Sequence, residues 1–160
     1  MEIQEVHVRV PEGQQIIIGQ AHFIKTVEDL YEALVTSMPG LKFGVAFCEA
    51  SGKARIRFDG SDPKLSRAAQ RYASLIGAGH VFVVVLAGAF PINVLNRLKA
   101  VEEVVNIFCA TSNSITVVVA DSRKGRGVLG VIDGVTPKGK ETERDKEERH
   151  AFLRKIGYKR

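Results

Sequence analysis

The segment from Val81 to Leu86 constrains the fold more than any other part of the chain, because all six of its side chains are apolar. A run of this length that is rich in valine is typical of a strand covered on both faces of its sheet. The run ends after Ala87 and is far too short to cross a bilayer as a helix. The N-terminal residues show no apolar stretch of the signal-peptide kind. We therefore expect a central strand with packed elements on both sides, in a soluble, cytoplasmic protein.

Two periodicities alternate along the rest of the chain. Period-2 alternation and short apolar runs predict strands at 6–10, 15–18, 41–47, 54–58, 107–110, 115–120 and 128–132. Apolar residues at helical spacing predict helices at 27–38 and 63–76. Further helices are expected at about 92–101 and, in the charged C-terminal segment, at about 141–156. This order predicts an α/β fold, with a mixed sheet, βαβ crossovers and helices that cover the sheet. We expect a single domain over residues 1–160, in which residues 138–160 form a charged C-terminal helix.

Local signals predict where several elements begin and end. Asp62 followed by Pro63 is typical of a capped helix start, and Gly77 of a helix end. Thr26 is the expected cap of the first helix. The turn at 11–13 predicts that the chain reverses direction after the strand at 6–10 and returns as the strand at 15–18.

Connectivity predicts which loops lie together. Helices follow the strands at 54–58 and 81–86, so these strands and the next are expected to pair in parallel, with their carboxyl ends at one edge. That edge carries Asp62, Asn93 and Asn113, and ligands in α/β sheets commonly bind in such a crevice. The helix N-termini at Pro63 and Pro91 offer backbone N–H groups that suit an anion.

The opposite edge is expected to gather His80, the turn at 51–53 and the loop at 121–126. This expectation assumes that the strand at 115–120 returns antiparallel through a short turn. Since a strand rises about 3.3 Å per residue, His80 and Pro91 lie roughly 25 Å or more apart. One subunit therefore cannot easily use both edges as a single site, whereas an oligomer could bring them together across an interface.

The charge distribution argues against a nucleic-acid-binding surface. The chain carries a net charge of +5, but residues 138–160 hold nine basic and five acidic side chains, or +4. Residues 1–137 hold fourteen basic and thirteen acidic side chains, so the rest of the chain is nearly neutral. Opposite charges interleave in the C-terminal segment, as on a solvated helix with i,i+4 pairs. The two cysteines, Cys48 and Cys109, lie in apolar strands and are expected to be reduced core thiols.

One glycine motif and one histidine are candidates for chemistry. Residues 125–130 match G-x-G-x-x-G, but they run into a strand instead of opening a helix, so a dinucleotide fingerprint is not expected. Gly125 and Gly127 lie beside Arg123, Lys124 and Arg126, which could still bind a phosphate. The sequence has no P-loop, no protein-kinase catalytic loop and no zinc-type spacing of cysteine and histidine.

His80 differs from the other three histidines, because Gly77-Ala78-Gly79 leaves its approach open and a rigid strand follows it. A lone histidine is more often structural than catalytic, so the residues alone leave both roles open.

Five runs of the sequence together resemble the adenosine-specific kinase family, prokaryotic proteins unrelated to the sugar-kinase type of adenosine kinase. They are KFGVAFCEA at 42–50, GAGH at 77–80, FPINVLN at 90–96, IFCATSN at 107–113 and GRGVLGVIDG at 125–134. The resemblance implies an α/β domain that assembles as trimers or hexamers and binds AMP and ADP. It also implies a phosphoryl group carried on a histidine, and His80 is the matching position.

The first hypothesis is a phosphotransferase acting on adenosine with a nucleotide as donor or product, so the expected partners are adenosine and AMP, ADP or ATP. His80 would hold the phosphoryl group, and Arg126, Lys124 or Arg123 would neutralise its charge. Asp121 or Asp133 could orient His80 or hold Mg²⁺, which is expected with the nucleotide; no prosthetic group is expected.

The alternative is a sensor or regulatory protein that binds adenine nucleotides without turnover, with His80 only hydrogen-bonding the ligand. A third option is RNA binding through the C-terminal helix, which contains only Phe152 and Tyr158 as stacking residues.

Overall fold

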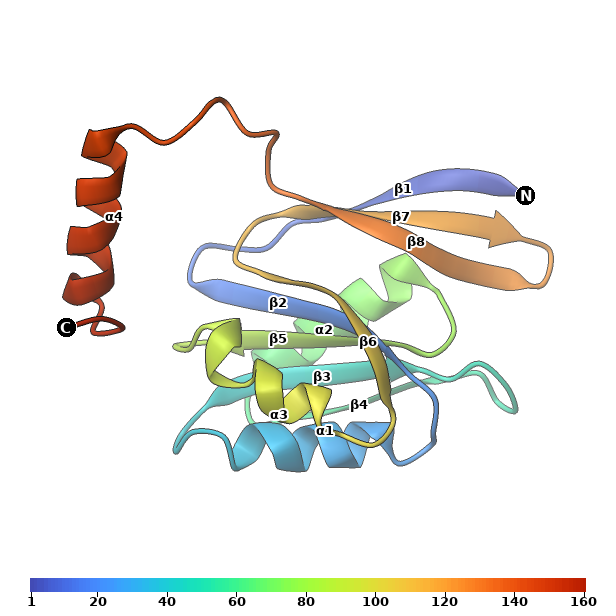
Figure 1. Cartoon of the computed structure of the whole chain (residues 1–160). Coiled ribbons are helices and arrows are strands. Elements are labelled where there is room, and N and C mark those ends of the chain that lie inside the picture. Colours follow the sequence, from blue (N-terminus) through green and yellow to red (C-terminus); the bar gives the residue numbers. More distant parts are fainter.

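The computed structural model describes all residues from 1 to 160 (Figure 1). Its strands are β1 (Glu2–Val8), β2 (Gln14–Ala21), β3 (Lys42–Cys48), β4 (Ile56–Gly60), β5 (Val81–Ala87), β6 (Val104–Thr111), β7 (Ile115–Ser122) and β8 (Gly125–Asp133). Its helices are α1 (Thr26–Val35), α2 (Pro63–Ile76), the 3-10 turn η1 (Pro91–Asn93), α3 (Leu95–Lys99) and α4 (Glu143–Lys155). The expected α/β class is confirmed. None of the helices has the length and apolar character needed to cross a membrane.

The apolar run identified in the sequence is the middle strand of a five-stranded sheet with the order β4-β3-β5-β2-β6. All residues of β5 from Val81 to Leu86 are buried. Val83 and Val85 face one core, while Phe82, Val84 and Leu86 face the other. The expectation of a strand covered on both faces is therefore confirmed.

The expected parallel pairing is wrong, because every pair of neighbouring strands in this sheet is antiparallel. Each helical crossover skips one position, which an antiparallel strand fills: β3 lies between β4 and β5, and β2 lies between β5 and β6. Strands β4, β5 and β6 nevertheless run in one direction, since each is antiparallel to the strand between them. Their carboxyl ends share one edge, as expected, although the sheet is not mixed.

A second sheet of three strands has the order β1-β7-β8 and is also antiparallel. Two expectations from local turns are therefore wrong: β2 does not pair with β1, and β7 does not pair with β6. Strand β1 instead pairs with β7, from Glu2 opposite Asp121 to Val8 opposite Ile115. The chain changes sheets at both turns, which short turn sequences do not reveal.

The elements form three layers (Figure 1). Helices α1 and α3 cover one face of the five-stranded sheet and bury Leu30, Leu34 and Leu98 there. The other face is covered by α2 and by the second sheet, which buries Val117 and Val119. Helix α4 lies apart from these layers at the end of a long connection, and none of its residues is buried.

Helix ends follow the sequence signals in part. Asp62 caps α2, Pro63 occupies its first turn, and Gly77 ends it in the left-handed conformation, as expected. Thr26 does not cap α1, because it is already helical and its hydroxyl donates to the carbonyl of Phe23. The third predicted helix is broken into η1 and α3. The interleaved charges of α4 pair as expected, with Arg144 donating to Glu148 across four residues.

Gly44 allows α2 to approach the central sheet closely. A Cβ atom at this position would lie 2.2 Å from the backbone carbon of Leu65 and 2.2 Å from the amide nitrogen of Ser66. Backbone atoms cannot move aside as a flexible side chain can. Any larger residue would therefore push α2 away from β3.

Gly44→Ala is expected to lower the free energy of unfolding by roughly 1–3 kcal/mol, because the added methyl group overpacks this contact. Thermal unfolding followed by calorimetry measures the effect. Gly130→Ala is the matched control, since a Cβ there meets nothing within 4 Å. Equal melting temperatures for the two variants would contradict the argument.

Candidate functional site

His80 lies between the end of α2 and the start of β5, in a backbone conformation that is unusual for its type. Its φ angle is +64°, in the left-handed region that non-glycine residues seldom adopt. Two hydrogen bonds fix this conformation: the His80 amide donates to the Cys48 carbonyl at 2.7 Å, and its carbonyl accepts from Ala21 at 2.9 Å. Strained residues held in this way gather at functional sites. The surrounding strands thus hold the candidate histidine in place.

The imidazole ring of His80 stacks on the ring of Phe47, with 6.0 Å between the centroids and 9° between the planes. The side chain of Phe47 is buried, so it gives the imidazole a rigid support. Neither Asp121 nor Asp133 hydrogen-bonds to this ring, so the structure does not show the carboxylate partner that we considered from the sequence. The ring is oriented by packing.

The His80 ring lines a hollow of about 470 Å³, which we call the histidine hollow. One wall comes from the β2–α1 connection, where Phe23 and Ile24 are 53% and 66% exposed. Another comes from the turn at 51–53, including Lys53, and from Arg57 on β4. The hollow therefore combines an apolar surface, two cationic side chains, the carboxylate of Glu49 and an imidazole. The turn at 51–53 thus lies at the same hollow as His80, as expected.

Glu49 organises the cationic wall. One of its carboxylate oxygens accepts from Nε and Nη2 of Arg57 at 2.8 and 2.7 Å, and the other accepts from the amide of Arg55 at 2.9 Å. The amide of Arg55 and the side chain of Arg57 lower the pKa of Glu49, so it stays ionised. These bonds fix the Arg57 guanidinium at the edge of the hollow, and its Nη1 has no hydrogen-bond partner within the chain.

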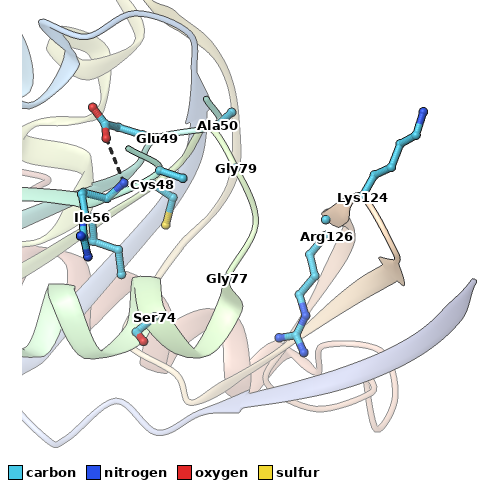
Figure 2. Close-up of a pocket in the computed structure, with 12 residues that line it drawn as sticks. Cys48, Glu49, Ala50, Ile56, Ser74, Gly77, Gly79, Lys124 and Arg126 are labelled. Atoms are coloured by element: carbon cyan, nitrogen blue, oxygen red, sulfur yellow. Dashed lines mark hydrogen bonds between the residues drawn. The ribbon is translucent and has the colours of Figure 1, made fainter. Parts of the chain in front are cut away.

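A neighbouring hollow of about 530 Å³, the hairpin hollow, shares Glu49 and Ala50 with the first. Figure 2 shows Lys124 and Arg126 on one side of it, across from the segment from Cys48 to Ala50 and the connection from Gly77 to Gly79. The expected gathering of the 121–126 segment at this edge is confirmed. It arrives there as the β7–β8 hairpin of the second sheet.

Arg126 docks that hairpin onto the end of α2. Its Nε donates to Asp121 at 2.7 Å, and its two terminal nitrogens donate to the Leu75 carbonyl at 3.4 Å and to the Gln4 amide oxygen at 3.3 Å. The backbone of Arg126 also bridges Ala78. With three partners, Arg126 is largely occupied within the chain, whereas the ammonium of Lys124 has none.

The two cysteines are not candidates for nucleophiles. Both are free and buried, as expected. Burial raises the pKa of Cys48 to about 11 and that of Cys109 to about 12, so both remain thiols at neutral pH. Although Cys48 lines the hairpin hollow, it is not a reactive thiolate there.

The other predicted site residues make their contacts away from His80. Asp62 accepts from the amides of Lys64 and Leu65. Asn93 accepts from the Phe90 amide and donates to the hydroxyl of Tyr158.

Asn113 and Thr111 both donate to Asp133 at the far end of the β7–β8 hairpin. Asp121 and Asp133 lie at opposite ends of this hairpin, because Asp121 pairs with Arg126 and Asp133 lies seven residues farther along β8. At about 3.3 Å per residue, roughly 20 Å separates the two aspartates, so one metal ion cannot bind both within a chain. No three or more His, Cys, Asp or Glu side chains are grouped so that they could hold a metal ion.

The glycine motif at 125–130 lies on β8, with Gly125 at the hairpin turn, and it opens no helix. The expectation that it is not a dinucleotide fingerprint is confirmed. The backbone of Gly127 pairs with Ala120 in the sheet. A Cβ at Gly127 or Gly130 would meet nothing within 4 Å, so close packing does not require glycine at either position.

Sequence reasoning missed Phe23, Glu49 and Arg57. Glu49 and Arg57 are separated by eight residues across the β3–β4 hairpin, where Phe47 pairs with Arg57. Had the register of the β3–β4 pair been predicted correctly, the sequence would have placed these two charged side chains next to each other. Phe23 lies in a connection without periodicity, and no sequence signal points to it.

Comparison with known proteins places the chain in a family. Residues 6–159 match the family model described as adenosine specific kinase. The crystal structure of the PH1918 protein from Pyrococcus horikoshii OT3 is 44% identical in sequence, with a TM-score of 0.94 over 99% of this chain and 98% of that one. No curated protein matches the chain. The match over nearly the whole length, on the same fold, shows that this chain belongs to the adenosine-specific kinase family.

Proposed function

We propose that this protein is a phosphotransferase acting on adenosine and that His80 carries the phosphoryl group between donor and acceptor. Family membership supports adenosine phosphotransfer as the reaction class. The observation that carries the role of His80 is its strained but doubly hydrogen-bonded backbone at the wall of the histidine hollow. An imidazole in a fixed place, next to two cations, suits the capture of a phosphoryl group.

The nucleotide binds in the histidine hollow in this proposal. Adenine stacks on Phe23, which is half exposed and ready to receive a planar ring. The phosphates contact Lys53 and the guanidinium of Arg57, which Glu49 holds in place. AMP and ADP are both ligands of this kind. Lys124 flanks the neighbouring hollow and can reach further phosphate oxygens.

The reaction has two steps. A neutral ring nitrogen of His80 attacks the terminal phosphorus of ATP; the N–P bond forms, the P–O bond breaks, and ADP leaves with the electron pair. A ribose hydroxyl of adenosine then attacks the phosphorus, the N–P bond breaks, and the hydroxyl proton passes to water as AMP forms. Lys53 and Arg57 offset the charge on the transferring oxygens in both steps. Mg²⁺ would be held by the nucleotide phosphates and would offset part of their charge, since the chain groups no three His, Cys, Asp or Glu side chains that could hold it.

Intact-mass spectrometry after incubation with ATP and Mg²⁺ tests the covalent route. We expect a gain of one phosphoryl group that adenosine discharges and that His80→Asn abolishes. Asparagine tolerates the left-handed backbone at this position better than alanine does, so the variant should remain folded. His150→Gln, on exposed α4, is the matched control and should label like the wild type. Label that persists in His80→Asn would exclude His80.

A second candidate function is a sensor that binds adenine nucleotides without turnover. The observation that favours it is the absence of a carboxylate hydrogen bond to the His80 ring, which is oriented only by stacking on Phe47. The labelling experiment separates the two functions: if AMP binds but no phosphoryl label forms on the protein, the sensor is favoured.

Phe23→Ala is expected to weaken AMP binding about tenfold, because stacking of a base on an aromatic ring contributes roughly 1–3 kcal/mol. Calorimetric titration measures the affinity. Phe58→Ala is the control, since Phe58 is 56% exposed, much like Phe23, but lines neither the histidine hollow nor the hairpin hollow. Equal losses in both variants would remove Phe23 from the nucleotide site.

We also propose that the chain assembles as a trimer or hexamer and that α4 packs against another copy. Helix α4 has thirteen residues and no buried side chain, and isolated helices of this length are marginal in water. Its tail touches its own chain through Tyr158, which hydrogen-bonds to Asn93 and packs edge-on against Phe90. Phe152 and Ile92 remain 55% and 71% exposed beside this contact.

Removal of residues 138–160 is expected to reduce the molar mass measured by light scattering to that of a smaller assembly. The body should stay folded, since neither core cluster contains a residue of α4. An unchanged number of subunits would show that α4 does not hold the copies together.

A further inference from the structure

A third hollow, of about 600 Å³, lies at the opposite edge of the central sheet, where β5 ends and β3 begins. Four basic side chains line this basic hollow: Lys42, Lys64, Arg67 and Arg71. It is closed by Pro11 of the β1–β2 connection and by Gln14 at the start of β2. The four cations come from two elements, β3 and α2, that pack against each other in the fold.

Helix α2 supplies three of the cations from one side. Lys64, Arg67 and Arg71 are spaced by three and four residues, so they follow each other along one face. The opposite face of the helix buries Leu65, Ala69 and Tyr72, among others, against the sheet. Like charges at such spacing destabilise a helix slightly. A bound anion would remove that repulsion.

Acidic side chains are scarce in the basic hollow. None of the four cations takes part in an ion pair, although nine such pairs occur elsewhere in the structure. Asp62 is the only acidic residue of the lining, and one of its oxygens already accepts from the amides of Lys64 and Leu65. With four positive charges and one negative charge, the lining carries +3, whereas residues 1–137 together carry only +1.

One cation is already oriented. The Arg71 guanidinium lies 4.9 Å above the centre of the Tyr72 ring and donates to the Tyr72 hydroxyl at 3.1 Å. That hydroxyl in turn donates to the carbonyl of Arg9 at 2.6 Å. Since the Tyr72 ring is buried, Arg71 is held at the hollow before any ligand arrives.

The N-terminus of α2 does not provide the anion site that the sequence suggested. Pro63 has no N–H group, and the next two amides donate to Asp62. An anion here must be bound by side chains, and four separate cations match several phosphoryl groups better than one. The volume suits a ligand larger than a single phosphate.

We propose that the basic hollow binds an oligophosphate: a linear chain of about three phosphoryl groups, free or as part of a nucleoside triphosphate. The buried amide oxygen of Gln14 has no hydrogen-bond partner, so it can accept from a hydroxyl of a nucleoside. The hollow and His80 lie at opposite ends of β5, which extends over seven residues, or roughly 20 Å. Within one subunit this site is separate from the proposed nucleotide site and does not depend on that proposal.

Titration calorimetry with inorganic tripolyphosphate tests the proposal on the full chain. Lys64→Ala combined with Arg67→Ala should weaken binding about tenfold or more, because two charge-assisted contacts are lost. The matched control removes two unpaired cations elsewhere, Lys99 on α3 and Lys155 on α4, both replaced by alanine, and should change affinity by no more than about twofold. Alanine favours helix at all four positions, so the variants should fold.

Three further measurements test whether the basic hollow is the binding site and whether the ligand is a free phosphate chain or a nucleoside triphosphate. Binding of tripolyphosphate should survive His80→Asn, and it should weaken as salt is raised. ATP that binds more tightly than tripolyphosphate in the His80→Asn background would identify a nucleoside triphosphate, whereas equal affinity would identify the phosphate chain alone as the recognised group. Three results would each overturn the proposal. They are an equal loss of affinity in the two double variants, no binding of either ligand to the wild type, and loss of tripolyphosphate binding in His80→Asn. If ATP does not label His80 but tripolyphosphate still binds, the result contradicts the proposed phosphohistidine and not the proposed oligophosphate site.

Discussion

The burial of β5 on both faces is the constraint on which the rest of the structure depends. An apolar strand of this kind needs hydrogen-bonded neighbours on both edges and a packed layer on each face, and β3, β2, the helices and the second sheet provide them. The strand is therefore rigid along its whole length. His80 precedes its first residue, and Ala87 at its last residue lines the basic hollow. A rigid, buried strand thus separates two polar sites at a fixed distance.

Rigidity also explains how His80 keeps a backbone conformation that costs roughly 1–3 kcal/mol. The amide and carbonyl of this residue are bonded to Cys48 and Ala21, which belong to strands on either side of β5. Any relaxation of His80 would break these bonds at the end of the buried sheet. The side chain is consequently presented from a backbone that cannot turn away, although no charged partner orients the ring.

The sequence predicted the elements better than their partners. Local signals were sufficient for the apolar run of β5 and for Asp62, Pro63 and Gly77 at the ends of α2, because these residues act on their immediate neighbours. Pairing of β1 with β7 joins residues more than a hundred positions apart, and nothing local indicates it. For the same reason the candidate site was predicted only in outline. His80 and the 51–53 turn were placed together correctly, but Phe23 and Arg57 enter the hollow through tertiary packing alone.

Net charge gives a misleading picture of where this protein can bind anions. Most of the excess positive charge belongs to residues 138–160, yet those side chains are exposed and several pair with acidic neighbours along α4. The nearly neutral body instead concentrates unpaired cations in one hollow at the end of β5. Affinity for an anion depends on convergent charges that lack partners, and not on their total number. Because β5 separates this hollow from His80, phosphate groups bound at the two edges of one chain cannot react with each other. A reaction between them would require the edges of two different copies to meet.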